Sequence, residues 1–550
     1  MTKTTRLLTL SFTAVLLTAC ESGDINLSPT NVSNGGGGGG GGGASNPCAS
    51  YVVAGTTRQG SYDGTNCTYD SAFVSESNPL TVNLRIPRIS GVHIFADSLY
   101  VGAGVEPPGI APAGGTGPTL IIEAGNTLAF NAADNILINR GSTIRAEGTA
   151  NEPITFTGYE DAIAHTAGPY DSQLWAGIVI NGNGLTNNCD DAQRAAGQCH
   201  VLGEGKPSRY GGNDNAESSG VLRYVVVKHA GFDVSGLGDE LNGVTFNAVG
   251  SGTIVENLQI YSGFDDGIEF FGGAVNVTNY VALYVRDDSI DFSDGYSGTV
   301  KNALVIHAPQ NSNNCVEGDN IASGRIPNTN PGSASTLPQT MPTISHMTCI
   351  MSNYDTGTHG ASRGVIIRFG ARATITDSVI ETGRGAAENG SASTPAPAVA
   401  NVCWEIDGGS TPDSINAAQA GQTTINRTVI NCQTPTTTTA PADNINGGPQ
   451  TAWIMNTGGT PSAFNTNNAV IATTSFEDPT VTVLQPGTFF SFDDDTTNGQ
   501  VTLRGPTGAA VVLQVPDNYI GAVQSTANWT AGWTYGFVVG NRGITPWWEQ

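Results

Sequence analysis

Short runs in which apolar and polar residues alternate recur along most of the chain, separated by Gly and Asn/Asp turns. One series repeats an Asn or Asp ahead of an alternating run, and its members begin 24, 22 and 26 residues apart: Asn242–Phe246, Asp266–Phe270, Asp288–Phe292 and Asn314–Glu317. A second series opens on Thr: Thr299–Asn302, Thr343–His346, Thr374–Asp377 and Thr424–Arg427. Amphipathic helical periodicity is lacking between these runs, so the pattern predicts an all-β repeat protein.

A repeat of this length made of short strands fits one coil of a parallel β-helix, in which each coil stacks about 4.8 Å from the next. Alternation then predicts an interior apolar column and, on the opposite face, a polar one. The interior column is Val244, Ile268, Ile290 and Val316, and the polar column is Thr245, Glu269, Asp291 and Glu317. Asp266, Asp288 and Asn314 fall near a turn, where stacked polar side chains can bond backbone amides as a ladder.

The alternatives are a β-propeller, whose blades need roughly 40 to 50 residues each, and a β-sandwich, which does not repeat in columns. We therefore expect a parallel β-helix over residues 81–475, preceded by an N-terminal cap at 46–80. Residues 476–550 change character and are expected to form a β-rich C-terminal cap, because a solenoid must close its open end. Trp529 and Trp533 are predicted to lie in the core of that cap, with Trp547 and Trp548 partly exposed.

The charge balance excludes some partners. The chain has 22 Lys and Arg against 47 Asp and Glu, a net charge of −25, which repels nucleic acid and anionic lipid headgroups. We therefore expect no nucleic-acid partner and a preference for cations or neutral molecules. Charged residues make up only 13% of the sequence, which also argues against an ordinary helix-rich enzyme.

The first 45 residues are expected to contain an export signal followed by a flexible tether. Lys3 and Arg6 precede an apolar stretch too short to span a bilayer, and Leu17-Thr-Ala-Cys20 ends it, which predicts an export signal over residues 1–19. This ending resembles the lipobox of bacterial lipoproteins, which implies cleavage before Cys20 and acylation of Cys20; an ordinary signal peptide is the alternative. Glu21 favours the outer membrane, since Asp at that position is associated with inner-membrane retention. Residues 20–45 include nine consecutive glycines and are expected to form a flexible tether.

Eight cysteines remain after Cys20, an even number in an exported chain. Their spacing groups them as neighbours, although eight cysteines allow 105 connectivities. We predict four local disulfides: Cys48–Cys67, Cys189–Cys199, Cys315–Cys349 and Cys403–Cys432. A zinc site is the weaker alternative, because the cysteines are dispersed and form no Cys-x-x-Cys pair.

Several motifs between residues 115 and 310 resemble a family of exported bacterial right-handed, pectate-lyase-like β-helix proteins, mostly surface lipoproteins of unsettled function. These motifs are Trp175–Gly182, Ser208–Asp214, Ser218–Val225, Asp239–Thr245 and Asp265–Gly273. The resemblance implies a right-handed β-helix and a surface location, and it brings no catalytic residues. A more distant resemblance to polygalacturonases rests on Asp265-Asp266 and Arg286-Asp287-Asp288, but the Gly-His-Gly and Arg-Ile-Lys motifs of those enzymes do not occur here.

The acidic column Glu269, Asp291 and Glu317 is the candidate site. Neighbouring coils would hold these carboxylates at about 5 Å and alternate coils at about 10 Å, which brackets the separations used by glycosidases. Stacked carboxylates can also bind Ca²⁺, here through Asp265, Asp287, Glu269 and Asp291. The alternative is a solvated acidic face without a specific ligand. Arg368 lies on a predicted strand and could serve a lyase, while Asp493–Asp495 could bind calcium but is better explained as a turn.

Three functions follow from these features. The leading hypothesis is a lipid-anchored scaffold in the outer membrane, facing the cell exterior, that binds a glycan or a membrane-protein partner without catalysis. The second is a polysaccharide lyase or glycoside hydrolase that uses the acidic column, with calcium as a possible cofactor. The third is a structural subunit of a surface layer or filament.

Overall fold

The computed structural model describes the following residues: 46–205, 208–234, 236, 239–309, 311–320, 338–351, 362–382, 401–408, 413–432, 434–437, 441–457, 464–471, 491–492, 500–504, 510–514, 519–524 and 527–536. The described residues all belong to one compact unit that begins at Asn46. Cys20, Asp493–Asp495, Trp547 and Trp548 lie outside them.

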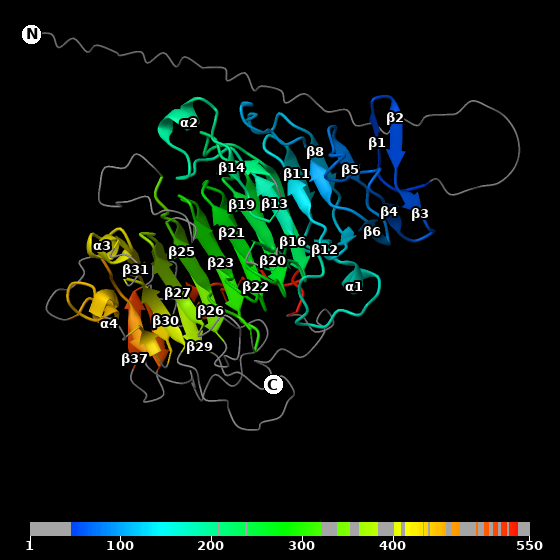
Figure 1. The fold of residues 1–550 in the computed structure, drawn as a ribbon. Helices are drawn as coiled ribbons and strands as arrows, with labels where there is room; N and C mark the ends of the chain where they lie inside the picture. The colour runs from blue at the N-terminus through cyan, green and yellow to red at the C-terminus, as the bar shows by residue number, and fades with distance from the viewer. Residues whose placement is uncertain are drawn as a thin grey trace, which may run out of the picture. The chain divides into compact units, whose positions relative to one another are not determined.

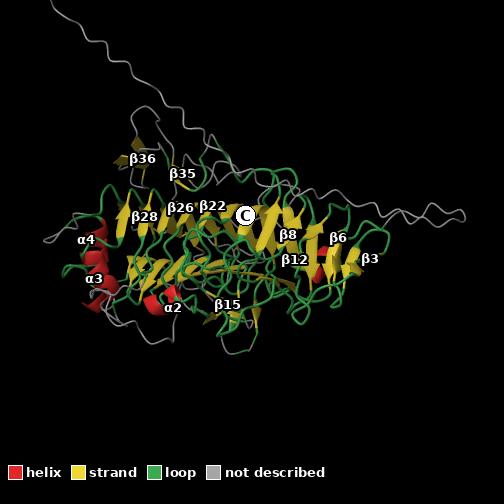
Figure 2. Cartoon of the chain, turned by 90° about the horizontal axis from the view of Figure 1, so that it is seen from above, coloured by secondary structure: helices red, strands yellow, loops and turns green. Residues whose placement is uncertain are grey.

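The unit is a parallel β-helix, as predicted. One face is a ten-stranded sheet in which every pairing is parallel. In spatial order its strands are β7 (Leu99–Val101), β10 (Ile136–Ile138), β13 (Ile178–Asn181), β19 (Val244–Asn247), β21 (Ile268–Phe271), β23 (Ile290–Ser293), β25 (Val316–Asp319), β27 (Arg363–Arg368), β30 (Val402–Ile406) and β33 (Thr434–Thr436). Figures 1 and 2 show these strands stacked in a row, with the second sheet beside them.

The second sheet has eighteen strands and is parallel throughout, except where β3 pairs with β4. Its strands are β3 (Ser61–Tyr62), β4 (Cys67–Tyr69), β5 (Leu84–Ile86), β6 (Val92–Phe95), β8 (Thr119–Ile122), β9 (Thr127–Phe130), β11 (Thr143–Glu147), β12 (Ile154–Gly158), β16 (Gly220–Lys228), β20 (Ile254–Tyr261), β22 (Asn276–Leu283), β24 (Thr299–Ile306), β26 (Thr343–Met351), β28 (Thr374–Thr376), β29 (Val379–Thr382), β31 (Thr424–Asn426), β32 (Val429–Asn431) and β34 (Ala469–Ile471). Parallel stacking therefore begins at β4, within the segment expected to be the N-terminal cap.

The long strands of this sheet bend in the middle. β16 pairs with both β11 and β12, and the bend falls at Tyr224, whose φ is +49°. In the next three coils the bend residue is an asparagine with positive φ, namely Asn257, Asn279 and Asn302. Asparagine tolerates this left-handed conformation better than most residues. Its side chains also form a ladder, because Nδ2 of Asn279 donates to Asn257 and Nδ2 of Asn302 donates to Asn279.

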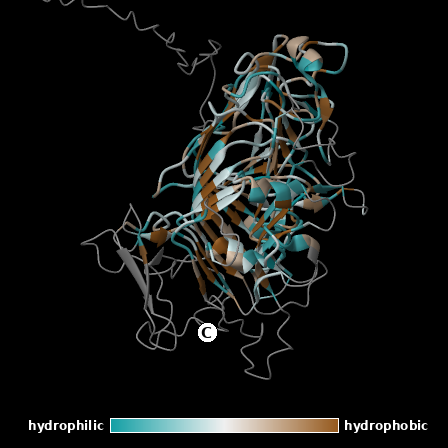
Figure 3. Ribbon diagram, turned by 90° about the vertical axis from the view of Figure 1, so that its left-hand side faces the viewer, coloured by the Kyte–Doolittle hydropathy of each residue, from teal (hydrophilic) through white to brown (hydrophobic). Residues whose placement is uncertain are grey.

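The interior of the solenoid is apolar and carries stacked aromatic rings. Tyr69, Phe95, Phe130 and Trp175 follow one another with ring centroids 4.6, 5.3 and 5.1 Å apart. The predicted interior column Val244, Ile268, Ile290 and Val316 is fully buried. Figure 3 shows hydrophobic colouring on the strands and hydrophilic colouring on many connecting loops. Burial of this column supplies the main driving force for stacking.

The remaining elements are short. Four two-stranded hairpins are antiparallel: β1 (Ser50–Val53) with β2 (Thr56–Gln59), β14 (Val201–Leu202) with β15 (Arg209–Tyr210), β17 (Phe232–Asp233) with β18 (Glu240–Leu241), and β36 (Gln500–Arg504) with β37 (Ala510–Gln514). β35 (Ser491–Phe492) pairs with β38 (Ile520–Gly521). The helices are α1 (Tyr159–Ala162), α2 (Asp191–Ala195), α3 (Asp413–Gln419), α4 (Gln450–Ile454) and the 3₁₀ turn η1 (Pro441–Asp443).

The four predicted disulfides are confirmed. Cys48 is bonded to Cys67, Cys189 to Cys199, Cys315 to Cys349, and Cys403 to Cys432. The pair Cys315–Cys349 joins the loop before β25 to β26, and so links the two sheets.

The described C-terminal aromatic residues, Tyr519, Trp529, Trp533 and Tyr535, pack on the side of the solenoid and not across its end. Residues 519–524 and 527–536, here called the strap, lie against the outer face of the eighteen-stranded sheet. Trp533 is buried as predicted, but its neighbour is Tyr224 in β16, and the backbone of Tyr535 bonds Gln259 in β20. The strap covers a second apolar core that includes Tyr261, Leu283, Leu304 and Ile350.

The last coils are covered by α3 and α4 instead. Trp453 of α4 packs against Trp404 of β30, with ring centroids 6.2 Å apart. The side chain of Gln450 accepts the backbone N–H of Ile406 and donates to its carbonyl. Both helices lie at one end of the row of strands in Figure 2. A polar side chain thus satisfies backbone groups of β30 that would otherwise be unpaired.

Candidate cation site

The predicted polar ladder exists and fixes two aspartates in place. Oδ1 of Asn242 accepts the backbone N–H of Asp266 at 3.0 Å, and Oδ1 of Asp266 accepts that of Asp288 at 2.9 Å. Oδ1 of Asp288 accepts the backbone N–H of Asn314 at 2.8 Å, and Oδ1 of Asn314 accepts the backbone N–H of Arg363 at 3.1 Å. Each side chain therefore positions the turn of the following coil, and the carboxylates are held by the backbone.

The predicted polar column is also confirmed in register. Thr245 pairs with Glu269, Glu269 with Asp291, and Asp291 with Glu317, on β19, β21, β23 and β25 of the ten-stranded sheet. The structure places the same four residues outside the apolar interior, but they do not form a solvated face. Glu269 is only 7% exposed, and Nδ2 of Asn242 donates to its Oε2 at 2.5 Å. Asp291 and Glu317 are partly exposed.

Loops inserted between coils explain this burial. The hairpins β14–β15 and β17–β18 bring Glu204 and Glu240 close to Asp265, and Glu204 also acts electrostatically on Glu269. The two hairpins are joined by a hydrogen bond from the backbone N–H of Gly205 to Asp239 at 2.7 Å. The expectation of a solvated acidic face is therefore wrong for Glu269, because coil periodicity carries no information about inserted hairpins.

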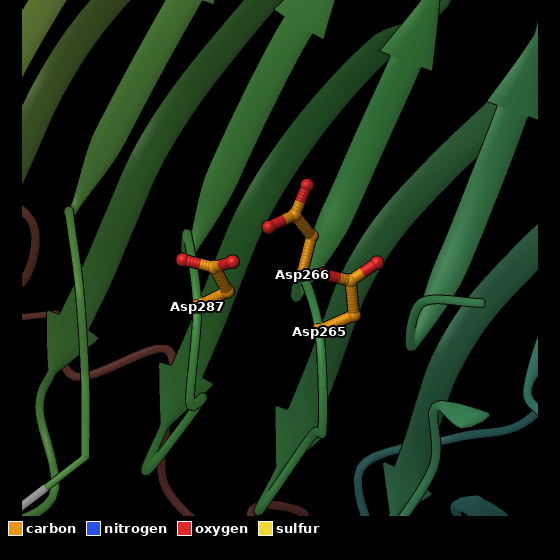
Figure 4. A group of neighbouring side chains, drawn as sticks. All are labelled: Asp265, Asp266 and Asp287. Carbon is orange, nitrogen blue, oxygen red and sulfur yellow. The ribbon is translucent and has the colours of Figure 1, made fainter. Parts of the chain in front are cut away.

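Among the described residues, three groups of carboxylates have the proximity that a cation requires. They are Asp265 with Asp266 and Asp287, Asp266 with Glu269 and Asp291, and Asp288 with Asp291 and Glu317. Within each group one oxygen per residue lies within 4.8 Å of the others. Figure 4 shows Asp265 and Asp266 on one turn and Asp287 on the turn of the next coil. Asp266 and Asp291 each belong to two groups, so the three groups form one continuous cluster, here called the acidic cluster.

The electrostatics of the acidic cluster are unfavourable without a counter-charge. Burial and then neighbouring carboxylates raise the pKa of Asp265, Asp266 and Glu269 well above the ordinary range. The pKa of Asp288 is raised by burial and by Asp287 and Asp291. Burial raises the pKa of Asp291 to about 7, even though the Arg368 guanidinium opposes that shift. Packed carboxylates of this kind take up either protons or a metal ion.

One oxygen of the acidic cluster has no partner within the described part of the chain. Oδ1 of Asp291 is buried and makes no hydrogen bond there. Asp291 also lies at the junction of two of the three groups. A buried carboxylate oxygen without a donor is costly, and a hard cation is the kind of ligand that would satisfy it.

Arg368 has a structural role at the edge of the cluster. It forms ion pairs with Glu317 and, at 3.0 Å, with Asp319, and it lies on β27 one coil beyond them. Asn314 also donates to Glu317 at 3.1 Å. Glu317 is thus engaged by an arginine and an amide, which leaves it poorly suited to act as a free general acid or base.

The four residues predicted to hold calcium do not form one group by themselves. They are connected only through Asp266, which was not predicted to bind calcium. Asp265 and Asp287 belong to one group, Glu269 and Asp291 to another, and Asp266 joins the two. Asp266 and Asp288 were assigned to the backbone ladder, which they form, and the structure also places each of them in at least one carboxylate group. Glu204 and Glu240 were missed because they sit on inserted hairpins with no repeat signal.

An open pocket of about 490 Å³ lies elsewhere, between α2, the β14–β15 hairpin and the loop at Pro107. Its lining includes Gln198 and His200, whose side chains bond the backbone at Pro108 and Gly109. These polar groups maintain the loop, and the pocket does not include the acidic cluster.

The fold and the acidic cluster define a parallel β-helix protein with a candidate cation site on one sheet. A model of the pectate-lyase-like beta helix domain matches residues 114–457, more than half of the chain, and the protein belongs to that family. Searches of curated proteins and of solved structures returned no match. Within the described residues, no helix has the length and apolar character needed to cross a bilayer.

Proposed function

We propose that the protein is a lipid-anchored scaffold of the outer membrane that holds Ca²⁺ in the acidic cluster and binds an acidic glycan through it, without cleaving it. The observation that carries the proposal is the cluster itself, three overlapping carboxylate groups on successive coils with a buried, unpartnered oxygen of Asp291 at their junction. Carboxylate oxygens are the ligands that Ca²⁺ takes, and a partly exposed ion can accept oxygens of an anionic sugar.

Burial and existing side-chain contacts argue against catalysis by Glu269 and Glu317. Glu269 is 7% exposed, and Asp266 and Asp288 beside it in the acidic cluster are 6% and 4% exposed, so a polysaccharide would not reach them. Glu317 is held by Arg368 and Asn314. A binding role needs only the exposed side of the cluster, formed by Asp265, Asp287 and Asp291.

The test is calorimetric titration of the purified full chain with Ca²⁺ after removal of metal by EDTA, with Mg²⁺ as a comparison. We expect saturable Ca²⁺ binding that Asp291→Asn weakens at least tenfold. Glu256→Gln is the matched control, since Glu256 is a partly exposed carboxylate on the other sheet that pairs with Arg223. Equal Ca²⁺ affinity in the parent chain and Asp291→Asn would remove the cluster from the proposal.

Glycan binding is measured separately, by retention of the Ca²⁺-loaded chain on acidic and neutral polysaccharides. Retention on acidic polysaccharides that EDTA abolishes would support the proposal. Ca²⁺ binding without any retention would argue instead for the other partner considered, a protein of the outer membrane.

Catalysis is the second candidate, and one observation favours it. Asp291 has a pKa raised to about 7 by burial and lies in a carboxylate group with Glu317, so it could donate a proton near neutral pH. New chain ends in a polysaccharide digest that disappear in Asp291→Asn would establish a lyase or hydrolase. Unchanged polysaccharide length in the presence of Ca²⁺ would leave the binding role.

The membrane anchor is proposed on the sequence of residues 1–20. Cys20→Ala should abolish acylation and release the chain from the membrane fraction. The outward orientation is tested by adding protease to intact cells. Cleavage only after permeabilisation would place the protein on the inner side of the membrane.

A further inference from the structure

A lysine, an aspartate and a histidine that are not members of the acidic cluster meet beneath the strap. Lys228 ends β16, and its Nζ lies 2.9 Å from Oδ1 and 2.8 Å from Oδ2 of Asp161 in α1. Lys228 is 7% exposed and His229 is 2% exposed. The ring of Tyr535, from the strap, covers Nζ with its centroid 3.9 Å away. Lys228 and His229 are therefore poorly accessible to an outside substrate, and the groups that lie within reach of them are those of the site itself.

His229 is oriented as a base toward this pair. Its Nδ1 lies 2.6 Å from the carbonyl oxygen of Asp171, and because a carbonyl only accepts, Nδ1 carries the proton. Nε2 then carries the lone pair and lies 3.7 Å from Oδ1 of Asp161. Burial lowers the pKa of His229, which keeps the ring neutral. A neutral imidazole beside an amine and a carboxyl group can carry protons between them.

The other oxygen of Asp161 has a fixed donor. The hydroxyl of Thr157 donates to Oδ2 at 2.7 Å, and Thr157 is almost completely buried. This donor is positioned to stabilise negative charge on Oδ2 if the carboxyl carbon is attacked. The aromatic rings of Tyr261 and Tyr535 meet edge to face beside the site, with centroids 4.7 Å apart.

We propose that Lys228 and Asp161 form an intramolecular isopeptide bond. Nε2 of His229 takes a proton from the Lys228 ammonium and passes it to Oδ1 of Asp161, and the freed amine then attacks Cγ of the neutral carboxyl group. The Cγ–Oδ1 bond then breaks. Oδ1 leaves as water with two of the three Nζ protons, one of them returned by His229, while the third stays on the amide nitrogen. Oδ2 becomes the amide oxygen, still bonded by Thr157. No oxidant or co-reactant is needed.

The bond would link two distant positions of the chain that no disulfide connects. Asp161 and Lys228 are 67 residues apart, and the segment between them contains β13, α2 and the β14–β15 hairpin. The proposal is independent of the cation site and of glycan binding.

Peptide mapping tests the bond directly. The purified full chain is reduced, denatured and digested with trypsin, and the peptides are weighed by mass spectrometry. A linked chain gives Ala146–Arg194 joined to Tyr224–Arg286, lighter than their sum by one water, because trypsin does not cut at an acylated lysine. An unlinked chain gives Tyr224–Lys228 and His229–Arg286 as separate peptides.

Two variants make the result specific. Lys228→Arg keeps the charge and the ion pair but lacks the amine nucleophile, and it should give no linked peptide. His229→Gln retains both reacting groups and should lower the linked fraction at least tenfold. Full recovery of free Tyr224–Lys228 from the folded parent chain would overturn the proposal and leave an ion pair only. An unchanged linked fraction in His229→Gln would remove His229 from the mechanism.

Discussion

Oδ1 of Asp266 accepts the backbone N–H of Asp288, one coil further on, at 2.9 Å. The same bond is made by an amide oxygen at both ends of the ladder, from Asn242 and from Asn314. The ladder therefore requires an acceptor oxygen and not a charge. The negative charge of the two aspartates must be explained by something else, and the cation site proposed above supplies a reason.

Replacing Asp288 separates these two roles. Asp288→Asn keeps an acceptor for Asn314 and removes a buried carboxylate, so the metal-free chain should be at least as stable as the parent at pH 8. Asp288→Ala leaves the N–H of Asn314 unbonded and should lower the free energy of unfolding by about 1–3 kcal/mol. Urea unfolding in EDTA measures both. A larger loss of unfolding free energy in Asp288→Asn than in Asp288→Ala would contradict the assignment of Asp288 as a ladder acceptor whose charge is not needed for folding.

Stability of the metal-free chain should fall as pH rises. The folded-state pKa values of Asp265, Asp266 and Glu269 are raised, and that of Asp291 is raised to about 7. The unfolded chain therefore ionises first, and the stability present below about pH 4 is lost as pH rises toward and past 7. Thermal unfolding in EDTA from pH 5 to pH 8 should show a decreasing midpoint. Added Ca²⁺ should reverse the trend at pH 8, and a pH-independent midpoint would argue against the raised values.

Glu217 should contribute a separate part of that pH dependence. It is 5% exposed, its Oε1 accepts the N–H of Gly250 at 2.6 Å, and burial raises its pKa to about 7. A shift of this size from 4.5 corresponds to roughly 3 kcal/mol at pH 8. Glu217→Gln should recover part of this free energy of unfolding at pH 8 and none of it at pH 4. Since Glu217 is not a member of the acidic cluster, Ca²⁺ affinity should not change, and a reduced affinity would show that the two are coupled.

Removal of the central strap residue should detach the strap without unfolding the coils. Trp533 is 1% exposed and packs on Tyr224 and Trp529. Trp533→Ala should cost about 3–5 kcal/mol locally. Hydrogen exchange should then lose protection in the strap and keep it in β20 and β22. Tyr62→Ala, at an exposed aromatic position, is the control and should leave both unchanged.

The disulfide Cys315–Cys349, which links the two sheets, should matter to global stability. Cys315 and Cys349 are 34 positions apart, and loss of their bond through a Cys315→Ala, Cys349→Ala double variant should cost about 3–4 kcal/mol by the loop-entropy relation. Denaturant unfolding under non-reducing conditions checks this. A change below about 0.5 kcal/mol would mean that this relation does not describe the bond, as it fails to do in some proteins.

The sequence predicts those features that repeat. The register of Val244 with Ile268 and of Glu269 with Asp291 follows from alternation and spacing alone, and so does the Asp266 ladder. The disulfides are predictable because each partner is the nearest cysteine along the chain.

Features that depend on distant segments could not be predicted in this way. The burial of Glu269 depends on hairpins that occur once, and the position of Trp533 depends on a contact with Tyr224 that leaves no periodic signal. The meeting of Asp161 with Lys228 likewise depends on a short helix outside the repeat. Spacing informs only about neighbouring coils, whereas these contacts are set by irregular loops.

The strap also bears on the order in which the molecule can form. Gln259 and Tyr535 bond each other across 276 residues, while each coil contacts mainly the coils next to it. Coils can therefore assemble in sequence as the chain emerges, N-terminal part first. The apolar outer face formed by Tyr261, Leu283 and Leu304 stays uncovered until the strap has arrived. During that interval this face is open to aggregation, so a chaperone acting on this protein would be needed after these strands have formed and before the strap docks.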